Sequence, residues 1–151
     1  MGNSTALAMV KEGLPAKIIE IVERSPRRVY VYIAPDEILD AARFMFEQCG
    51  GRLATVSGID TRSGIELVYH WMFPKDHQFI MIKTKVKKPF PEIDSIGRFL
   101  PAANWIEREI HDLFGVTFRG HPDFRRLLLA DSWPEGVHPY LRDVRFEEFQ
   151  P

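Results

Sequence analysis

The chain has 151 residues, a formal net charge of −1 and 45% hydrophobic residues, which is the composition of a single globular domain. A net charge this small gives no general attraction to nucleic acid or to anionic membranes, and we expect no nucleic-acid partner. Cys49 is the only cysteine, which excludes an internal disulfide framework and fits a reducing compartment. No apolar run approaches the ~18 residues that span a bilayer, so we expect a cytoplasmic chain without direct membrane insertion.

The first part of the chain alternates between helical and extended patterns. Residues 6–14 form a short amphipathic pattern that ends at Gly13 and Pro15, which predicts a helix. Residues 17–23 are apolar and β-branched, and residues 28–33 alternate in period two, which predicts two strands. Only a short Ser-Pro turn separates these strands, so we expect them to pair as a hairpin.

A second helix is predicted from Pro35 to the pair Gly50-Gly51, because proline suits a first helical turn and glycine ends helices. Its apolar residues recur at helical spacing and define one inward face. This predicted face consists of Ile38, Ala41, Ala42, Met45 and Phe46.

Three further strands are predicted over residues 52–59, 65–73 and 78–86. The turns between them are short, which favours an antiparallel meander. Lys83 and Lys85 share one face of the third strand, which is typical of a solvated face or of an edge strand.

The third helix is predicted over residues 102–114, and Gly115 is its natural end. A proline-containing loop, residues 87–100, precedes it and has room for one helical turn near Ser95. The order of helix, hairpin, helix, meander, helix and tail predicts an α+β fold.

Side chains of the third helix are expected to divide between core and surface. Trp105, Ile110 and Leu113 are predicted in the core, on the apolar side of the helix. Arg108 and Asp112 lie four residues apart and can pair on the surface, an interaction of ~0.2–0.5 kcal/mol. A carboxylate of the tail is the alternative partner of Arg108.

The acidic and histidine residues of the third helix do not match a known catalytic or metal-binding spacing. Glu107 and His111 are four residues apart, whereas di-iron bundles use Glu-x-x-His and zincins use His-Glu-x-x-His. We therefore predict no catalytic residue, no metal site and no cofactor. An independent enzyme and a nucleic-acid module remain the alternative classes, which a search for turnover or for salt-dependent binding would reveal.

The last 33 residues, 119–151, hold four prolines and five arginines. They also hold aromatic residues, namely Phe124, Trp133, Tyr140, Phe146 and Phe149. This composition cannot build a regular core and is too aromatic for a solvated tail, while aromatic residues and arginine are enriched at interface centres. We predict an α+β domain over residues 1–118 and an extended partner-binding tail over residues 119–151, with folding back over its own sheet as the alternative.

A fixed series of residues runs through the third helix and the start of the tail. It consists of Glu107-Arg108-Glu109, two residues, Asp112-Leu113-Phe114, six residues, His121, three residues, and Arg125-Arg126-Leu127-Leu128. This series resembles the signature of the 30-kDa subunit family of respiratory complex I (NADH:quinone oxidoreductase) and the related membrane-bound energy-converting hydrogenases. The stretches 101–105 and 136–142 also look like that family, and the resemblance covers residues 17–145.

The resemblance implies a mixed, largely antiparallel sheet with helices on one face and an extended C-terminal tail. It also implies a hydrophilic subunit of the peripheral arm, without an active site or cofactor of its own. Such a subunit docks on the large subunit, which is of the quinone-site or NiFe type, beside iron-sulfur subunits at the cytoplasmic face of the membrane. An aromatic residue commonly precedes Asp112 in complex I members, where this chain has His111, so we favour the hydrogenase type. The NADH:quinone oxidoreductase subunit is the alternative.

Residues of the signature and of the tail are the candidates for binding the partner subunits. They are Glu107, Arg108, Glu109, Asp112, His121, Arg125, Arg126, Trp133, His138, Tyr140 and Arg142. Residues 121–129 are expected to fix the exit of the tail. For Arg125 and Arg126 we expect charge-assisted bonds to the partner or to carboxylates of this chain, because an unpaired buried arginine is costly.

Overall fold

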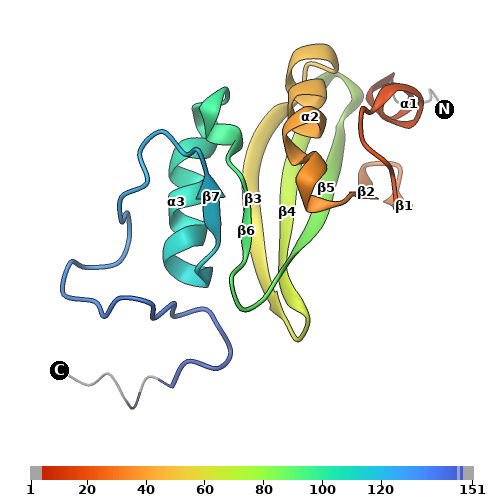
Figure 1. The fold of residues 1–151 in the computed structure, drawn as a ribbon. Helices are drawn as coiled ribbons and strands as arrows, with labels where there is room; N and C mark the ends of the chain where they lie inside the picture. The colour runs from red at the N-terminus through yellow and green to blue at the C-terminus, as the bar shows by residue number, and fades with distance from the viewer. Residues whose placement is uncertain (1–4, 146, 148–151) are drawn as a thin grey trace.

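The fold is described from a computed structural model, which covers residues 5–145 and 147. Phe146 and Phe149, two of the aromatic residues of the predicted tail, lie outside the described residues. Two sheets and three α-helices make up the structure (Figure 1). In chain order the elements are α1 (Thr5–Gly13), β1 (Glu20–Ser25), β2 (Arg28–Tyr32), α2 (Ile38–Arg43), β3 (Arg52–Thr61), β4 (Gly64–Phe73), β5 (Gln78–Lys87), β6 (Glu92–Asp94), α3 (Ala102–Phe114) and β7 (Thr117–Arg119).

The larger sheet has the strand order β1-β2-β5-β4-β3. β1 pairs antiparallel with β2, and β3, β4 and β5 form an antiparallel meander, so both predicted motifs are confirmed. The two motifs join because β2 pairs in parallel with β5. This single parallel pairing makes the sheet mixed, as the family resemblance implies, and it places β5 at the centre. Lys83 and Lys85 therefore do not lie on an edge strand. Lys85 is exposed, as the alternative of a solvated face predicts, whereas Lys83 is half-buried.

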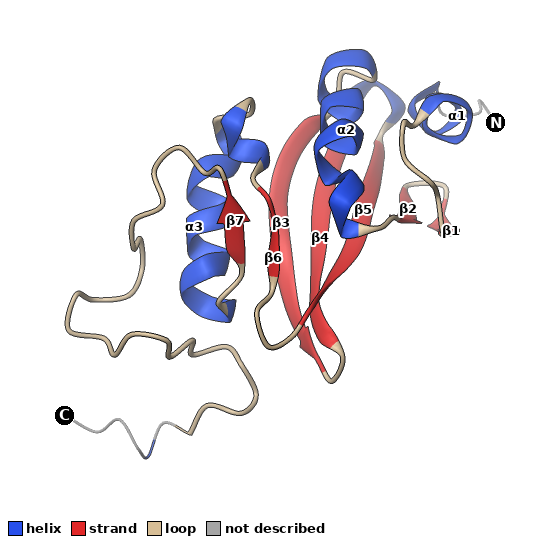
Figure 2. Cartoon of the chain, in the orientation of Figure 1, coloured by secondary structure: helices blue, strands red, loops and turns tan. Residues whose placement is uncertain are grey.

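One face of the larger sheet carries the core, and the helices cover that face (Figure 2). Its inward rows are fully or nearly fully buried and come from alternate positions of the two central strands, namely Ile65, Leu67, Tyr69, Trp71, Phe73, Ile80, Ile82 and Val86. Burying one side chain of this size contributes roughly 1.5–3 kcal/mol relative to leaving it exposed. The period-two pattern of the sequence thus sets which face holds the helices.

The second predicted helix is present but divided into three sections. A 3-10 turn at Pro35–Glu37 precedes α2, and a π-helical turn at Phe44–Gln48 follows it. Phe44 is buried and Phe46 is 41% exposed, so the prediction for Phe46 is wrong. The buried Phe44 ring lies against Gly13, the last residue of α1.

β6 and β7 form a second, two-stranded parallel sheet that the sequence does not reveal, because three-residue strands carry no periodicity. A 3-10 turn at Ile96–Arg98 follows β6, where the sequence predicts a helical turn. α3 has the predicted bounds and ends at Gly115, whose φ of +76° is the left-handed conformation that favours glycine. α3 packs over β3, where Gly58 leaves room for the Phe114 ring.

Candidate functional site

Three charged side chains of α3 are buried inside the protein. Glu107, Arg108 and Asp112 have exposed fractions of 0%, 8% and 1%. A buried charge is unfavourable unless it is hydrogen-bonded or paired, so each of these groups needs partners within the fold. Their partners lie in the segment before α3 and in the tail that crosses it.

Glu107 binds the turn that precedes α3. Its Oε2 accepts a hydrogen bond from the Ser95 hydroxyl at 2.5 Å, and its Oε1 accepts one from the Ile96 N–H at 2.7 Å. The Gly97 N–H also points at Oε1, at 3.4 Å. Burial raises the pKa of Glu107 to about 7, although these donors act in the opposite direction. The carboxylate therefore holds the entry of α3 in place.

His121 links the start of α3 to the tail as a neutral imidazole. Its Nε2 lies 2.9 Å from the Asn104 carbonyl oxygen, and its Nδ1 lies 3.0 Å from the Asp123 backbone nitrogen. A carbonyl only accepts and a backbone N–H only donates, so the proton is on Nε2 and Nδ1 is the acceptor. The side chain also approaches Glu107, with 3.7 Å between Nε2 and Oε2.

Arg108 and Asp112 bind the backbone of the tail. Arg108 donates from Nε and Nη2 to the carbonyl oxygens of Arg125 and Arg126, at 2.8 and 2.9 Å. Asp112 Oδ2 accepts from three successive backbone N–H groups, those of residues 127–129, at 2.9, 2.8 and 3.2 Å. Burial raises the pKa of Asp112, but these three hydrogen bonds outweigh it and the net shift is downward. The expected surface pair between Arg108 and Asp112 is therefore wrong, because each side chain binds the tail instead. The alternative partner, a carboxylate of the tail, is present, since Arg108 Nη1 lies 4.0 Å from Asp123 Oδ2.

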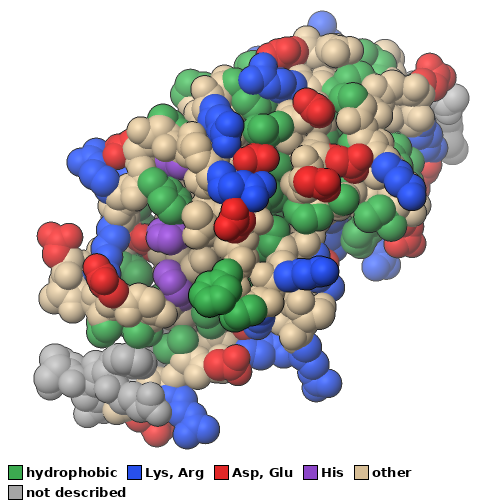
Figure 3. All heavy atoms as spheres, viewed as in Figure 1, with side chains coloured by type: hydrophobic (Ala, Val, Ile, Leu, Met, Phe, Trp, Pro, Cys, Tyr) green, Lys and Arg blue, Asp and Glu red, His purple; other side chains and the backbone are tan. Residues whose placement is uncertain are grey.

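We call these contacts of Glu107, Arg108, Asp112 and His121 with residues 95–97 and 121–129 the helix–tail junction. They confirm that residues 121–129 fix the exit of the tail. Figure 3 shows histidine side chains grouped on this face, where the tail crosses α3.

Arginines also order the tail itself. Arg125 pairs with Asp123, with 2.6 Å between Nε and Oδ1, as expected for a carboxylate of the same chain. Arg126 instead donates to the carbonyl oxygens of Ala130 and Trp133, at 2.8 and 2.9 Å. Within this chain, backbone carbonyls thus take the place of the expected carboxylate, and a bond from Arg126 to the partner subunit stays a prediction. The tail has no regular secondary structure from residue 120 to residue 145, so these side chains supply the hydrogen bonds that a helix or sheet would supply.

The second half of the tail returns to the domain. His138 Nδ1 lies 2.9 Å from the Asp112 carbonyl oxygen, and Tyr140 N–H donates to the Leu113 carbonyl at 3.0 Å. The Tyr140 ring meets the Phe114 ring edge-on, with 5.6 Å between centroids. Arg142 donates from its backbone N–H to Asp60 Oδ2 at 2.9 Å. The inner side of the tail therefore folds back onto its own chain, which is the alternative that the sequence left open.

The predicted site residues divide into an inner and an outer group, with Arg126 and His138 half-buried between them. Glu107, Arg108, Asp112 and His121 face their own chain. Glu109, Arg125, Tyr140 and Arg142 are exposed, as are their unpredicted neighbours Phe124 and Leu128. Trp133 donates its Nε1–H to the Val137 carbonyl and is half-buried. Partner binding by these residues stays a prediction.

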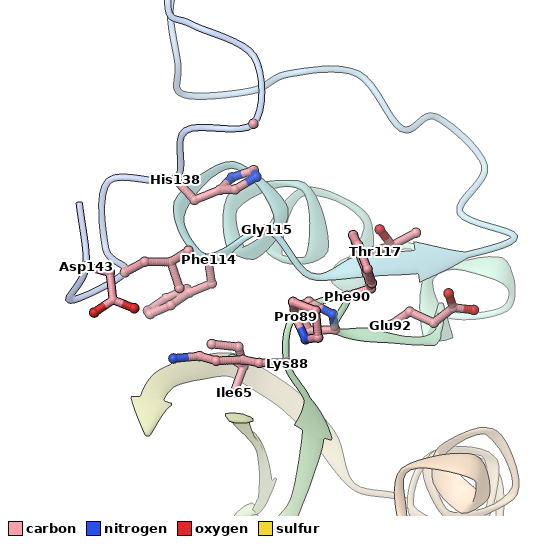
Figure 4. Close-up of a pocket in the computed structure, with 13 residues that line it drawn as sticks. Ile65, Lys88, Pro89, Phe90, Glu92, Phe114, Gly115, Thr117, His138 and Asp143 are labelled. Atoms are coloured by element: carbon pink, nitrogen blue, oxygen red, sulfur yellow. The ribbon is translucent and has the colours of Figure 1, made fainter. Parts of the chain in front are cut away.

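Trp105 and Phe90 are surface features that sequence reasoning missed. Trp105 is 69% exposed, so its predicted place in the core is wrong. It lies four residues before the exposed Glu109, and positions four apart share one face of a helix. The charge at position 109 could therefore have indicated that Trp105 faces outward. Phe90 is 87% exposed beside a groove lined by the loop before β6, the end of α3 and the tail (Figure 4).

Metal binding would require a cluster of ligating side chains, and membrane insertion would require a long apolar helix. Within residues 5–145, no group of three or more His, Cys, Asp or Glu side chains is arranged to hold a metal ion. None of the helices in that range is both long and apolar enough to cross a bilayer.

The sequence resembles those of respiratory-chain subunits. A family model described as "Respiratory-chain NADH dehydrogenase, 30 Kd subunit" matches residues 31–150. The C subunit of NADH-quinone oxidoreductase from Roseiflexus sp. (strain RS-1) is 33% identical over 150 residues, which cover 95% of this chain and 84% of that protein. Hydrogenase-4 component G of Escherichia coli (strain K12) is 31% identical over 149 residues, 96% of this chain but 27% of that protein. This chain thus spans about a quarter of that relative.

The fold also matches a solved respiratory complex. A chain in the structure of the membrane-bound sulfane sulfur reductase, an archaeal respiratory membrane complex, superposes with a TM-score of 0.81 at 25% identity. The match covers 95% of this chain and 85% of that one, so it includes the tail as well as the sheet.

Proposed function

We propose that this chain, which belongs to the family of the 30-kDa subunit of respiratory-chain NADH dehydrogenase, is a non-catalytic, cofactor-free docking subunit. In this role it binds the large subunit of a membrane-bound oxidoreductase complex and stabilises it in the peripheral arm. Neighbouring iron-sulfur subunits complete its surroundings. The complex would hold the chain at the cytoplasmic face of the membrane without insertion.

The observation that supports this role best is the helix–tail junction. The family signature places its charged residues where they bind the tail backbone, with Arg108 and Asp112 alone accounting for five hydrogen bonds. A segment without secondary structure is thereby held in one conformation before any partner arrives. Preorganisation lowers the entropic cost of binding, which is what a docking surface requires.

The outer side of the tail has the composition of an interface. Phe124, Leu128 and Tyr140 are exposed large hydrophobic residues, and Arg125 lies between the first two. Aromatic residues and arginine are the types that most often dominate binding energy. The tail is therefore the surface on which we place the large subunit.

One relative supports a large partner independently. In Hydrogenase-4 component G the region similar to this chain is 27% of the protein, so the remaining part of that polypeptide is covalently attached to a domain of this type. In this chain the corresponding contact would be made between separate subunits. An energy-converting hydrogenase type of complex is our first candidate, and NADH:quinone oxidoreductase is the second, supported by the match over most of the Roseiflexus protein.

A purification of the tagged chain from membranes of its source tests the proposal. We expect a large subunit to co-purify in equal amount, and NiFe-ligand cysteines in that subunit would select the hydrogenase type. The variant Leu128→Glu changes an exposed side chain of the tail and should lower recovery of the large subunit at least tenfold. Phe46→Ala, an exposed position outside the tail, is the matched control. Redox turnover by the purified chain alone would contradict the proposal.

A further inference from the structure

The described helices all cover one face of the larger sheet (Figure 2), and the opposite face carries a surplus of positive charge. Successive side chains of a strand point to opposite faces and cross-strand partners share one face, so the strand register identifies the residues of this outer face. The chain as a whole has a net charge of −1, so the surplus is local. We call this surface the basic sheet face. Its basic residues are Arg24, Arg28, Arg52, Lys83, Lys85 and Lys87, and its acidic residues are Glu20 and Glu66.

Two grooves that share Arg28 hollow the basic sheet face beside β2. The larger, of about 740 Å³, lies over β1 and β2. The smaller, of about 370 Å³, lies between the β1–β2 turn and the start of β5, where Met72 and Phe79 form part of its apolar wall. Glu20 is the only carboxylate among the residues that line the two grooves, whereas three arginines line them, namely Arg24, Arg27 and Arg28.

These three arginines have no acidic partner in the described part of the chain. Their side chains are exposed, and no carboxylate of residues 5–145 lies within ion-pair distance of any of them. The lysine of the larger groove differs, because Lys83 Nζ lies 2.8 Å from Glu66 Oε1. A guanidinium group binds a carboxylate through two parallel hydrogen bonds. The unpaired arginines around the grooves therefore favour carboxylates as the groups of a partner.

The tyrosines of this face are not free to stack against nucleic-acid bases. Lys83 Nζ lies 5.3 Å from the centroid of the Tyr30 ring and 5.0 Å from that of Tyr32. Both tyrosines are also half-buried. Single-stranded nucleic acid needs aromatic rings with an open face as well as cations, so the acidic partner of this surface is not a nucleic acid.

The apolar centre of the basic sheet face is recessed. Met81 and Val68 are only 3% and 5% exposed, and Phe79 beside them is 37% exposed. Attachment to a bilayer surface uses apolar side chains that project into it, whereas a protein partner can place a side chain in a hollow. A second copy of the chain, bound about a two-fold axis, would bring this patch against itself and arginine against arginine. An acidic protein surface is thus the occupant that the shape and the charge favour.

The basic sheet face and the tail lie at different places on the molecule. β1 and β2 form one edge of the larger sheet, while α3 packs over β3 at the other edge and carries the tail (Figure 1). The outer face is also the side of the sheet that α3 does not cover. Binding at the tail therefore leaves this surface open to a further contact.

We infer that the basic sheet face binds an acidic segment of a partner subunit of the complex. Carboxylates of that segment pair with Arg24, Arg27 and Arg28, and an apolar side chain of it enters the smaller groove beside Phe79. Complementary charge orients the approach of the partner and excludes partners of the wrong sign. The inference deepens the proposed function and rests on it, because the occupant is a subunit of the same complex.

A photo-crosslinking experiment on the assembled complex tests this surface directly. Benzoylphenylalanine replaces Phe79 in the full-length chain, and the crosslinked peptide is identified by mass spectrometry after purification from irradiated membranes. We expect a segment of a partner subunit with at least two carboxylates within four positions of the crosslink. The same label at Phe46 should not reach that segment. A crosslink from Phe79 to lipid, to a second copy, to a segment without carboxylates or to nothing would overturn the inference.

Charge reversal gives an independent readout. The double variant Arg24→Glu, Arg28→Glu should lower recovery of the crosslinked subunit by roughly fivefold or more, because close charge pairs add affinity and rim charges guide association. Both side chains are exposed, so the melting temperature of the isolated chain should stay unchanged. Lys17→Glu, Arg62→Glu is the matched control, since it makes the same change of charge at exposed positions that line neither groove. Equal recovery in the two double variants would overturn the inference.

Binding by the purified chain separates the other kinds of acidic partner. Wild-type chain and the variant Arg24→Glu, Arg28→Glu are mixed with vesicles of equal parts phosphatidylcholine and phosphatidylglycerol, and separately with single-stranded RNA. We expect the two proteins to behave alike in both assays. Binding to either ligand that is lost in the variant would assign the basic sheet face to a membrane or to nucleic acid and would overturn the inference.

The proposed function and this inference fail in different ways. A wild-type chain that co-purifies with no larger subunit contradicts the proposed function itself. A wild-type chain that co-purifies normally, but gives no crosslink from position 79 to an acidic segment, contradicts only the role of the basic sheet face.

Discussion

Glu107 is completely buried and accepts hydrogen bonds from three donors. Its burial raises its pKa, so the free energy of unfolding depends on pH. Its folded-state pKa of about 7 lies above its unfolded value, so the folded state binds the proton more tightly. The stabilising contribution of the protonated form is complete below the unfolded pKa, near 4.5, and is lost as the pH rises through 7.

Replacing Glu107 by Gln should remove this dependence. The amide oxygen accepts from the same backbone N–H groups, and the amide nitrogen donates to Ser95 Oγ. We expect the free energy of unfolding of Glu107→Gln to exceed that of the wild type at pH 8.5, by on the order of 2 kcal/mol, and to match it near pH 5. Urea titrations at both pH values measure this, and Glu109→Gln, an exposed neighbour, should follow the wild type. Parallel curves for wild type and Glu107→Gln would contradict the assignment.

Asp112 is the residue on which the path of the tail depends most. Asp112→Ala leaves three backbone N–H groups at residues 127–129 without their acceptor, at a cost of roughly 1–3 kcal/mol. Hydrogen exchange at these amides should become at least tenfold faster, whereas exchange in β4 and β5 should change far less. Protection at residues 127–129 that survives the substitution would show that other contacts fix the tail.

At the scale of elements, the contact between α3 and β3 depends on the absence of a side chain at Gly58. A Cβ atom at Gly58 would lie 2.7 Å from the Phe114 ring, closer than real Cβ atoms approach. Gly58→Ala should therefore displace α3 and lower stability by about 1–3 kcal/mol, measured as a lower melting temperature. In the double variant Gly58→Ala, Phe114→Leu the two losses should be less than additive, because the smaller side chain relieves the clash. Strict additivity would rule out this explanation.

Elements with long, regular patterns could be predicted from the sequence, and those built by tertiary contacts could not. The strands of the meander and α3 end within two residues of their predicted bounds, because period two and period 3.6 are local properties. The sequence could not reveal β6 and β7, since neither is long enough to show a period. The burial of Arg108 and Asp112 was equally hidden, because it depends on a tail that lies 15 or more residues away in the chain.

At the scale of the whole molecule, the division into a domain and a tail at residue 118 stays a prediction, and the helix–tail junction makes it testable. Truncation after residue 118 removes every tail partner of Arg108 and Asp112 and leaves both charges on α3 unsatisfied. We expect the truncated chain to be less stable, because it loses the five hydrogen bonds of Arg108 and Asp112, each of which contributes roughly 0.5–1.5 kcal/mol or more when one partner is charged. Thermal denaturation of both chains measures this, and equal melting temperatures would support an independent domain.

The parallel pairing of β2 with β5 has a consequence for how the chain folds. The hairpin and the meander each assemble from neighbouring segments, but the seam between them joins Arg28–Tyr32 to Phe79–Lys83, about fifty residues further along. Long loops close slowly, so the seam should form after both parts that it connects. Pulse-labelled hydrogen exchange during refolding should therefore show amides of β3 and β4 protected first and those shared by β2 and β5 last.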